Sequence, residues 1–315
     1  MFINNKICHL FDIKYPIIQG GMIWCAGWSL VSSVSNSGGL GVLGSGSMYP
    51  KILHEQILKV KAATTKPFGV NIPLIYPDIE KHVRTIIELQ VPIVFSSAGN
   101  PKTWTKTLQE NGIKVVHVVS SLKFALKAQD AGVDAIVGEG FEAGGHNGRE
   151  ETTTMCLTPL IAENIEVPLI SAGGISDGKS MLAGMILGAE GVQMGSRFVM
   201  SEESSAHQNF KDYISQSKEG HTELMLKKLT PVRLLKNEFY NKIKEAEIAC
   251  DSPENLIKIL GKGRAKKGMF EGDLTSGELE IGQVSASLTE IQPVNVLVNN
   301  IIKEFQLAKR NLNSL

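Results

Sequence analysis

Short apolar runs alternate with longer amphipathic segments between Ile17 and Met194. This alternation is typical of repeated βα units around a parallel sheet. The apolar runs predict eight strands, at residues 17–19, 40–43, 68–72, 93–96, 114–119, 135–137, 169–171 and 191–194. Between them, helices are expected to begin near Gly27, Tyr49, Pro77, Pro101, Ser121, Cys156 and Asp177.

Eight βα units in fewer than 200 residues favour an α/β fold of the TIM (β/α)8 barrel type over a doubly wound sheet. The punctuation of one helix supports these units independently, because Asp177 can cap its amino terminus and Gly188 follows its carboxyl terminus. We therefore expect residues 1–200 to form the barrel.

The pattern changes after Met200, where no strand-like run is evident and the chain becomes helical and charged through Gly261. Residues 201–283 are expected to form a smaller helical lobe that is inserted after strand eight and binds the substrate. Further on, apolar residues recur at helical spacing, so a carboxyl-terminal helix within residues 290–315 should pack back on the barrel. The recurring residues are Val294, Leu297, Val298, Ile301, Ile302 and Phe305.

Composition excludes several classes of protein and of binding partner. Lys plus Arg equals Asp plus Glu at 32 each, so neither nucleic acid nor disorder is expected. Residues 15–50 carry no charge, but Gly and Ser fill 15 of those 36 positions, so no membrane span is expected. The four cysteines have no metal-ligand spacing, and the amino terminus does not resemble a signal peptide. These features predict a reduced, cytoplasmic protein without a metal site.

One glycine motif is misleading. Residues 39–44 match the dinucleotide fingerprint, but no helix begins at the third glycine. The next strand also lacks the acidic residue that such a site needs about 20 residues later. A glycine-rich barrel strand and turn is the favoured interpretation.

Two glycine turns predict a phosphate site. They follow the last two predicted strands, at residues 171–175 and 192–197. In barrel enzymes these loops are the usual phosphate site, because glycine backbone lets amide donors point at the anion. The Gln19–Met22 segment and Asn71 end two other strands at the same mouth, where amides can bond to a planar cofactor ring.

The clearest candidate for catalysis lies in a loop after strand six. Residues 139–148 contain four glycines and one histidine, His146, which is suited to act as a general acid or base. The remaining histidines lack such surroundings and are expected to be structural or exposed: His9, His54, His82, His117, His207 and His221.

Together these motifs resemble the flavin-dependent enoyl-acyl-carrier-protein reductases and the related nitronate monooxygenases, which are 2-nitropropane dioxygenase-like barrels. Residues 15–22, 67–71, 139–148, 172–175, 188–198 and 282–283 carry the resemblance. It implies FMN as the cofactor and His146 as the catalytic residue. The cofactor-binding positions it implies are Gly20, Gly21, Met22, Asn71, Glu139, Gly145, Ala172, Gly173, Gly174, Gln193, Met194, Gly195 and Ser196.

Three short segments resemble the reductase branch, namely residues 203–207, 232–237 and 270–273. That branch implies reduction of trans-2-enoyl thioesters of acyl carrier protein or CoA by NADH or NADPH, as in fatty-acid elongation. Nitronate monooxygenase and NAD(P)H:quinone reductase remain alternatives, whereas a non-catalytic flavoprotein would not need His146. Whether the chain forms a homodimer stays open.

Two further features of the sequence, a basic run and Cys25, are candidate functional residues. Lys262, Arg264, Lys266 and Lys267 form a basic run that is either solvated surface or a landing site for an acidic carrier or nucleotide phosphates. Cys25 has no histidine placed to activate it, so it is expected to be a packed small residue.

Overall fold

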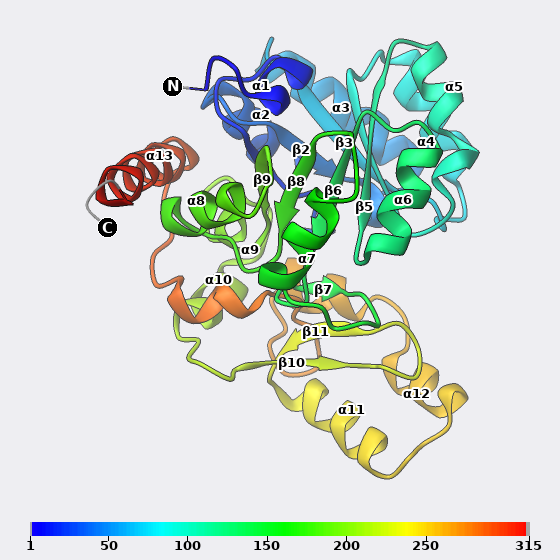
Figure 1. Ribbon diagram of the computed structural model, residues 1–315. Helices are drawn as coiled ribbons and strands as arrows, with labels where there is room; N and C mark the ends of the chain where they lie inside the picture. Colours follow the sequence, from blue (N-terminus) through cyan, green and yellow to red (C-terminus); the bar gives the residue numbers. More distant parts are fainter. Residues whose placement is uncertain (1, 313–315) are drawn as a thin grey trace.

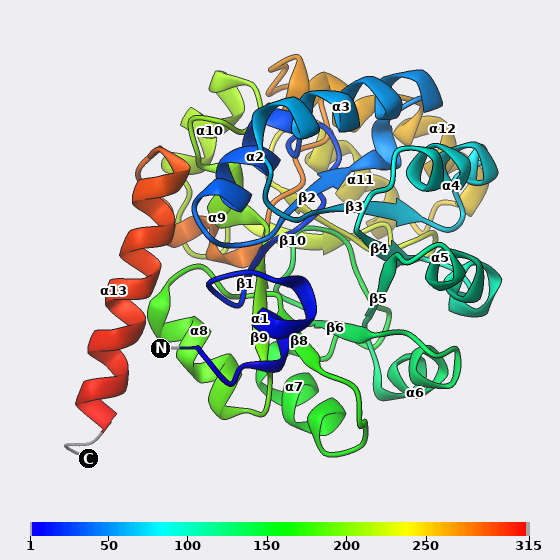
Figure 2. The ribbon, with the colours of Figure 1, turned by 90° about the horizontal axis from the view of Figure 1, so that it is seen from above.

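The computed structural model describes residues 2–312, and its largest part is a parallel eight-stranded barrel ringed by helices (Figures 1 and 2). The TIM-barrel prediction is confirmed, and the ends of each strand differ from the predicted ends by at most two residues. The strands follow the order β1-β9-β8-β6-β5-β4-β3-β2. They are β1 (Ile17–Gln19), β2 (Gly41–Gly44), β3 (Phe68–Pro73), β4 (Ile93–Ser97), β5 (Lys114–Val119), β6 (Ala135–Glu139), β8 (Leu169–Ala172) and β9 (Gly191–Met194).

The seam between β1 and β2 closes the barrel. Ile18 bridges to Leu40, and two backbone hydrogen bonds of 2.9 Å join Leu40 to Ile17 and to Gln19. The fully buried Gln19 side chain completes the seam, because its amide exchanges hydrogen bonds of 3.1 Å with the backbone of Val42. The amide of Gln19 therefore stabilises the barrel and is not available to a ligand ring, contrary to expectation.

Helices cover the outside of the barrel because each has one apolar stripe that packs on the strands. The helix expected at Pro101 is a 3-10 turn, η2 (Pro101–Thr103), and the helix expected at Cys156 begins two residues earlier. In chain order the covering helices are α2 (Trp28–Asn36), α3 (Pro50–Ala63), α4 (Ile79–Glu88), α5 (Thr105–Glu110), α6 (Leu122–Asp130), α7 (Thr154–Ala162), α8 (Gly178–Ile186) and α9 (Ser196–Val199). The helix α1 (Lys6–Phe11) instead lies across one end of the barrel, where Ile7 and Phe11 pack on apolar strand residues (Figure 2).

The predicted cap of α8 is present as a reciprocal capping box. The Asp177 carboxylate accepts a hydrogen bond of 2.7 Å from the Ser180 backbone, and the Ser180 hydroxyl accepts one from the Asp177 backbone. We expect Asp177→Ala to lower the free energy of unfolding in urea by about 0.5–2 kcal/mol. Asp130→Ala, at an exposed helix end, is the control and should change it by less than about 0.5 kcal/mol. An equal loss in both variants would contradict the capping role.

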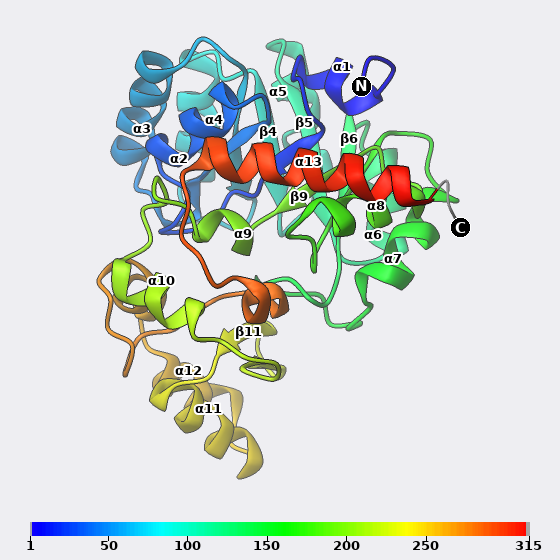
Figure 3. The ribbon, with the colours of Figure 1, turned by 90° about the vertical axis from the view of Figure 1, so that its left-hand side faces the viewer.

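Residues 201–293 form the second lobe, which lies against one end of the barrel (Figures 1 and 3). Its helices include α10 (Gln208–Ser215), α11 (Glu238–Ile248) and α12 (Pro253–Leu260), with a π-helical turn at Lys266–Phe270 and a 3-10 turn at Gln283–Ser287. The lobe also contains strands that the sequence pattern did not predict. The strands β10 (Thr222–Met225) and β11 (Val232–Leu235) join β7 (Gly145–His146) in an antiparallel sheet.

The long helix α13 (Val294–Leu312) packs on the barrel beside α8 (Figure 3). Its six recurring apolar residues are all buried. The contact is close at Gly178, where an added Cβ would lie 2.1 Å from the Phe305 nitrogen. Among residues 2–312, no helix combines the length and apolar character needed to cross a membrane.

Candidate active site

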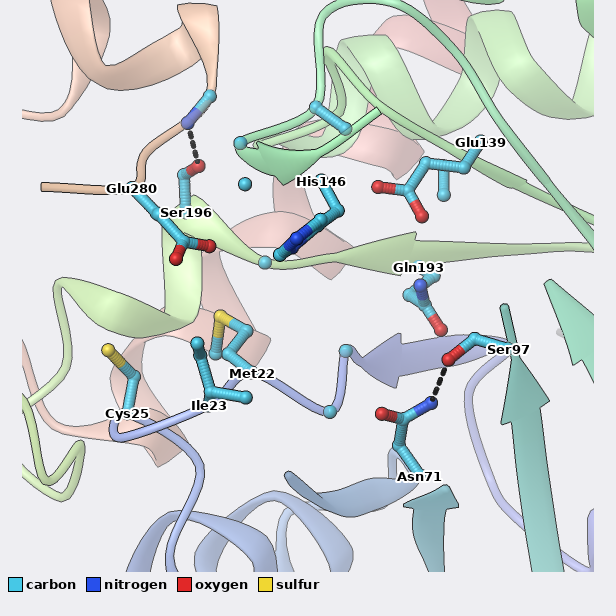
Figure 4. Close-up of a pocket in the computed structure, with 18 of the residues that line it drawn as sticks. Met22, Ile23, Cys25, Asn71, Ser97, Glu139, His146, Gln193, Ser196 and Glu280 are labelled. Atoms are coloured by element: carbon cyan, nitrogen blue, oxygen red, sulfur yellow. Dashed lines mark hydrogen bonds between the residues drawn. The ribbon is translucent and has the colours of Figure 1, made fainter. Parts of the chain in front are cut away.

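A cavity of about 520 Å³ lies between the carboxyl ends of the barrel strands and the second lobe (Figure 4). The barrel contributes residues at the ends of six strands, and the lobe contributes one wall. The strand-end residues are Gly20, Asn71, Ser97, Glu139, Ala172 and Gln193, and the lobe residues are Met269, Glu280, Ile281, Gly282 and Val284. The lobe thus covers the carboxyl-terminal face of the barrel, which is where TIM-barrel enzymes have their active sites.

The structure brings His146 and nearly all of the expected cofactor-binding residues together around this cavity. These are Gly20, Gly21, Met22, Asn71, Glu139, Gly145, Ala172, Gly173, Gly174, Gln193, Gly195 and Ser196. Met194 is the exception, because its side chain is fully buried in an apolar cluster with Ile17 and Phe198. Its backbone carbonyl is also occupied, since it accepts a hydrogen bond of 3.0 Å from Gly20.

The two glycine turns form a cradle of free backbone donors. Gly173 and Gly174 have φ values of +89° and +70°, which favour glycine because other residues rarely adopt this conformation. Within residues 2–312, no acceptor is hydrogen-bonded to the N–H groups of Gly173, Gly174, Gly195 or Ser196. Four N–H donors without partners, all on residues that line the cavity, suit a phosphate group. The Ser196 hydroxyl is positioned by the Gly282 backbone, which donates to it at 2.9 Å (Figure 4).

The opposite side of the cavity suits a flat polar ring. An added Cβ at Gly21 would lie 2.4 Å from the Asn71 Cβ, so only glycine leaves the backbone room there. The Asn71 amide donates to the Phe95 carbonyl at 3.0 Å and to the Ser97 hydroxyl at 3.3 Å, which fixes its orientation. Gln193 points into the cavity from β9 (Figure 4). The residues present therefore fit the FMN that the sequence resemblance implies.

His146 reaches the cavity because β7 pairs with β11, which places His146 opposite Val232. Its ring points toward the centre of the site (Figure 4). Part of the ring surface is open to the cavity, but protein surrounds the rest, and this desolvation lowers the pKa of His146 despite the opposing effect of Glu278. A lowered pKa favours the neutral imidazole, which can both donate and accept a proton. Of the seven histidines, all within the described range, His146 alone lines this cavity.

Three acidic residues, Glu139, Glu142 and Glu280, also line the cavity. Burial raises the pKa of Glu139 to about 7. Glu280 lines the cavity near His146, although nothing in the sequence pattern predicts this (Figure 4). Glu142 has a structural role instead, because its carboxylate accepts hydrogen bonds of 2.9 and 3.0 Å from the backbone and hydroxyl of Thr154.

Other residues of the cavity were missed because no motif marks them. Ser97 is the last residue of β4, so the rule that site residues lie at the carboxyl ends of barrel strands could have identified it. Ile75, Tyr76 and Pro77 lie in the loop after β3 and form one side of the opening. Glu280 comes from a distant part of the chain, and no local signal points to it.

Cys25 lines the cavity but is almost fully buried. Burial raises the pKa of its thiol to about 12, so the sulfur stays protonated. This supports its role as a packed small residue and not as a nucleophile. Among the described residues, no group of three or more His, Cys, Asp or Glu side chains could hold a metal ion.

The basic run does not form a free positive patch. Lys266 and Lys267 form ion pairs of 2.8 and 3.0 Å with Glu271 and Asp273. The Arg264 guanidinium donates to the Ser276 carbonyl at 2.9 Å and lies over the Phe239 ring. Lys262 is the one member of the run without a partner in residues 2–312. The structural interpretation of this run is therefore favoured.

Comparison with known proteins places the chain in a family. The family model for nitronate monooxygenase matches residues 4–82 and 78–304. A probable nitronate monooxygenase of Staphylococcus saprophyticus is 33% identical, covering 96% of this chain and 98% of that protein. A probable nitronate monooxygenase of Staphylococcus aureus is also 33% identical, with the same coverage.

Solved structures share the whole fold. FabK from Thermotoga maritima is 40% identical and superposes with a TM-score of 0.95, covering 99% of both chains. Nitroalkane oxidase from Streptomyces ansochromogenes has a TM-score of 0.84 at 23% identity, over 97% of this chain and 99% of that one, so it shows the fold alone. The chain therefore belongs to the nitronate monooxygenase family and is an oxidoreductase.

Proposed function

We propose that this protein is an FMN-dependent enoyl-acyl-carrier-protein reductase. NADH or NADPH would supply electrons to reduce trans-2-enoyl thioesters of acyl carrier protein or CoA. The observation that carries this proposal is the 40% identity to FabK over 99% of both chains, since FabK represents the reductase branch of the resemblance. The identity to the probable nitronate monooxygenases is lower, at 33%.

The cavity supports FMN as the cofactor. The N–H groups of Gly173, Gly174, Gly195 and Ser196 would hold its phosphate, and the Gly20–Met22 segment and Asn71 would line the space for its ring. When bound, FMN would accept hydride from NADH or NADPH and pass it to the β-carbon of the enoyl thioester. A mononucleotide is favoured over FAD because the dinucleotide fingerprint fails at residues 39–44.

His146 would complete the reduction. Hydride addition at the β-carbon leaves negative charge on the thioester oxygen and requires a proton at the α-carbon. The neutral His146 ring can donate its N–H to that oxygen or deliver the proton to the α-carbon. The apolar wall formed by Met22, Ile23 and Ile281 would exclude water from this step.

The second candidate is a nitronate monooxygenase, which the names of the Staphylococcus relatives favour. The same neutral His146 could act in the reverse sense, as a base that removes a proton from the carbon beside a nitro group. Oxygen would then be the electron acceptor in place of an enoyl thioester.

Steady-state assays of the yellow, FMN-loaded protein separate these functions. Crotonyl-CoA with NADH, and separately with NADPH, would be compared with an alkyl nitronate in air and with a quinone plus NAD(P)H. We expect kcat/KM to be highest for the crotonyl thioester. Turnover of the nitronate with no thioester reduction would support the monooxygenase, and fast reduction of the quinone alone would support a quinone reductase.

A further inference from the structure

Two glutamates outside the expected site share cavities with His146. Glu280 lines the main cavity, whereas Glu278 lines a second cavity of about 360 Å³. His146 lines both cavities, so its ring is open to the space that each carboxyl group lines. Figure 4 shows Glu280 and His146 facing the same space.

One edge of β11 positions these side chains. His146 is opposite Val232, and Glu280 bridges to Leu234, two residues further along the same strand. Side chains two positions apart on a strand share a face, so His146 and Glu280 lie on one side of the small sheet.

The two-residue alternation of side chains along an extended segment also puts Glu278 and Glu280 on the same face. Leu279 lies between them, is fully buried in the lobe core and accepts a backbone hydrogen bond of 2.8 Å from Leu235. The neighbours of Leu279 therefore point away from that core and toward the cavities.

The contact between Glu280 and β7 depends on glycine. Gly145 precedes His146 and has a φ of +75°, and an added Cβ there would lie 2.5 Å from a carboxyl oxygen of Glu280. A larger residue would displace this carboxyl group. Gly145 thus permits Glu280 to rest directly against the backbone that carries His146.

Neither carboxyl group has a matched counter-charge. In the described part of the chain, no residue donates a hydrogen bond to either one or forms an ion pair with either one. Arg264 faces Glu278, but its guanidinium donates to the backbone carbonyls of Leu260 and Ser276.

The other titratable groups near Glu278 and Glu280 do not supply a positive charge to balance the two carboxyl groups. Cys25 faces Glu280 as a protonated thiol. Lys211 lies beyond Cys25, and its ammonium donates to the carbonyls of Ser201 and Ser204. Burial, reinforced for Glu278 by the charge of Glu280, raises the pKa of both glutamates. Two such carboxyl groups do not both ionise at neutral pH, so the pair retains a proton.

We propose that Glu278 and Glu280 hold the proton that resupplies His146 during turnover. This inference rests on the proposed function only in taking His146 as the group that protonates the substrate. His146 gives its ring N–H proton to the α-carbon, and its other ring nitrogen takes a proton from the carboxyl pair. After product release the substrate-side ring nitrogen takes a proton from water and the other nitrogen returns its proton to the carboxylate, which restores the starting tautomer of His146 and the protonated pair. One hydride from NAD(P)H and one proton are consumed for each double bond reduced.

The first test separates the two half-reactions of FMN-loaded Glu278→Gln and Glu280→Gln. Glutamine keeps the shape of the side chain but cannot release a proton. We expect reduction of the flavin by NAD(P)H to be unchanged, and reoxidation by crotonyl-CoA to slow by about tenfold or more, as for loss of a proton donor. Glu271→Gln is the matched control, because this exposed glutamate pairs with Lys266 in the same lobe and should leave both rates unchanged.

The pH profile gives a readout that a packing defect would not produce. In the parent protein the rate of reoxidation should fall as pH rises through the pKa of the pair, because the protonated form is the donor. This limb should be lost in Glu278→Gln, which leaves a lower and flatter profile. An unchanged profile, with reoxidation within twofold of the parent in both variants, would overturn the proposal.

The second test does not depend on activity. Infrared difference spectra at pH 7 between the parent and the Glu278→Gln/Glu280→Gln double variant should show loss of a protonated carboxyl C=O band, whereas the contribution of Glu139 cancels. If no band is lost, the pair does not hold a proton and the proposal is wrong, whichever substrate the enzyme uses. If the band is lost but the parent reduces no enoyl thioester, the proposed function fails and the proton-holding pair stands.

Discussion

Replacing His146 with alanine is expected to lower turnover of the enoyl thioester by about 10²–10⁴-fold, the usual contribution of a positioned general acid. FMN should remain bound at its normal stoichiometry, because the glycine turns and Asn71 line the proposed cofactor position without help from the imidazole. The loss should appear in kcat with saturating thioester and in the reoxidation step. Flavin reduction by NAD(P)H should change little.

His221→Ala is the matched control, because His221 is an exposed histidine of the second lobe and does not line the cavity. It should retain full turnover. If His146→Ala stays within a few-fold of the parent at saturating substrate, His146 is structural, and the proposed proton transfer must be assigned to another group.

Gly174→Val is expected to weaken FMN binding by about 10- to 100-fold for each phosphate hydrogen bond that is lost. Charge-assisted hydrogen bonds contribute about 1.5–3 kcal/mol each, and about 1.4 kcal/mol corresponds to a factor of ten. Gly174 has a φ of +70°, and an added Cβ would lie 3.3 Å from the Glu142 side chain, so valine should shift the turn and misalign its donors. The dissociation constant is measured by fluorescence quenching of FMN.

Gly132→Val controls for backbone strain, because Gly132 also has a positive φ, +81°, but nothing lies within 4 Å of its added Cβ. It ends a helix on the outside of the barrel, far from the proposed phosphate position along the chain. This variant should lose stability while binding FMN normally. Normal FMN binding by Gly174→Val would exclude this turn as the phosphate site.

The barrel could be predicted from the sequence because its strands are short runs of apolar residues flanked by turns, as at β3 and β5. The lobe strands β10 and β11 were missed for a physical reason. Each has four residues and includes a charged one, Glu223 or Arg233, so neither has an apolar pattern of its own. Their pairing with each other and with β7 defines them as strands, and that pairing is a tertiary contact.

Some residues of the candidate site could likewise be predicted from the sequence, whereas others could not. The glycine turns directly follow β8 and β9, and His146 lies in the loop after β6, so their position along the chain places them at the mouth. The roles of Gln19 and Met194 depend on which way each side chain points, and both point into packed regions. Glu278 and Glu280 reach the cavities only because the lobe folds back over the barrel, which no local pattern encodes.

Anaerobic rapid mixing tests the proposed reductase activity most directly. Addition of NADH or NADPH to the FMN-loaded protein is expected to bleach the flavin absorbance, and crotonyl-CoA is then expected to restore it without oxygen, leaving butyryl-CoA in equal amount. The reductase assignment would be contradicted if the absorbance returned only with oxygen, or if NADH and NADPH failed to bleach the flavin while an alkyl nitronate succeeded.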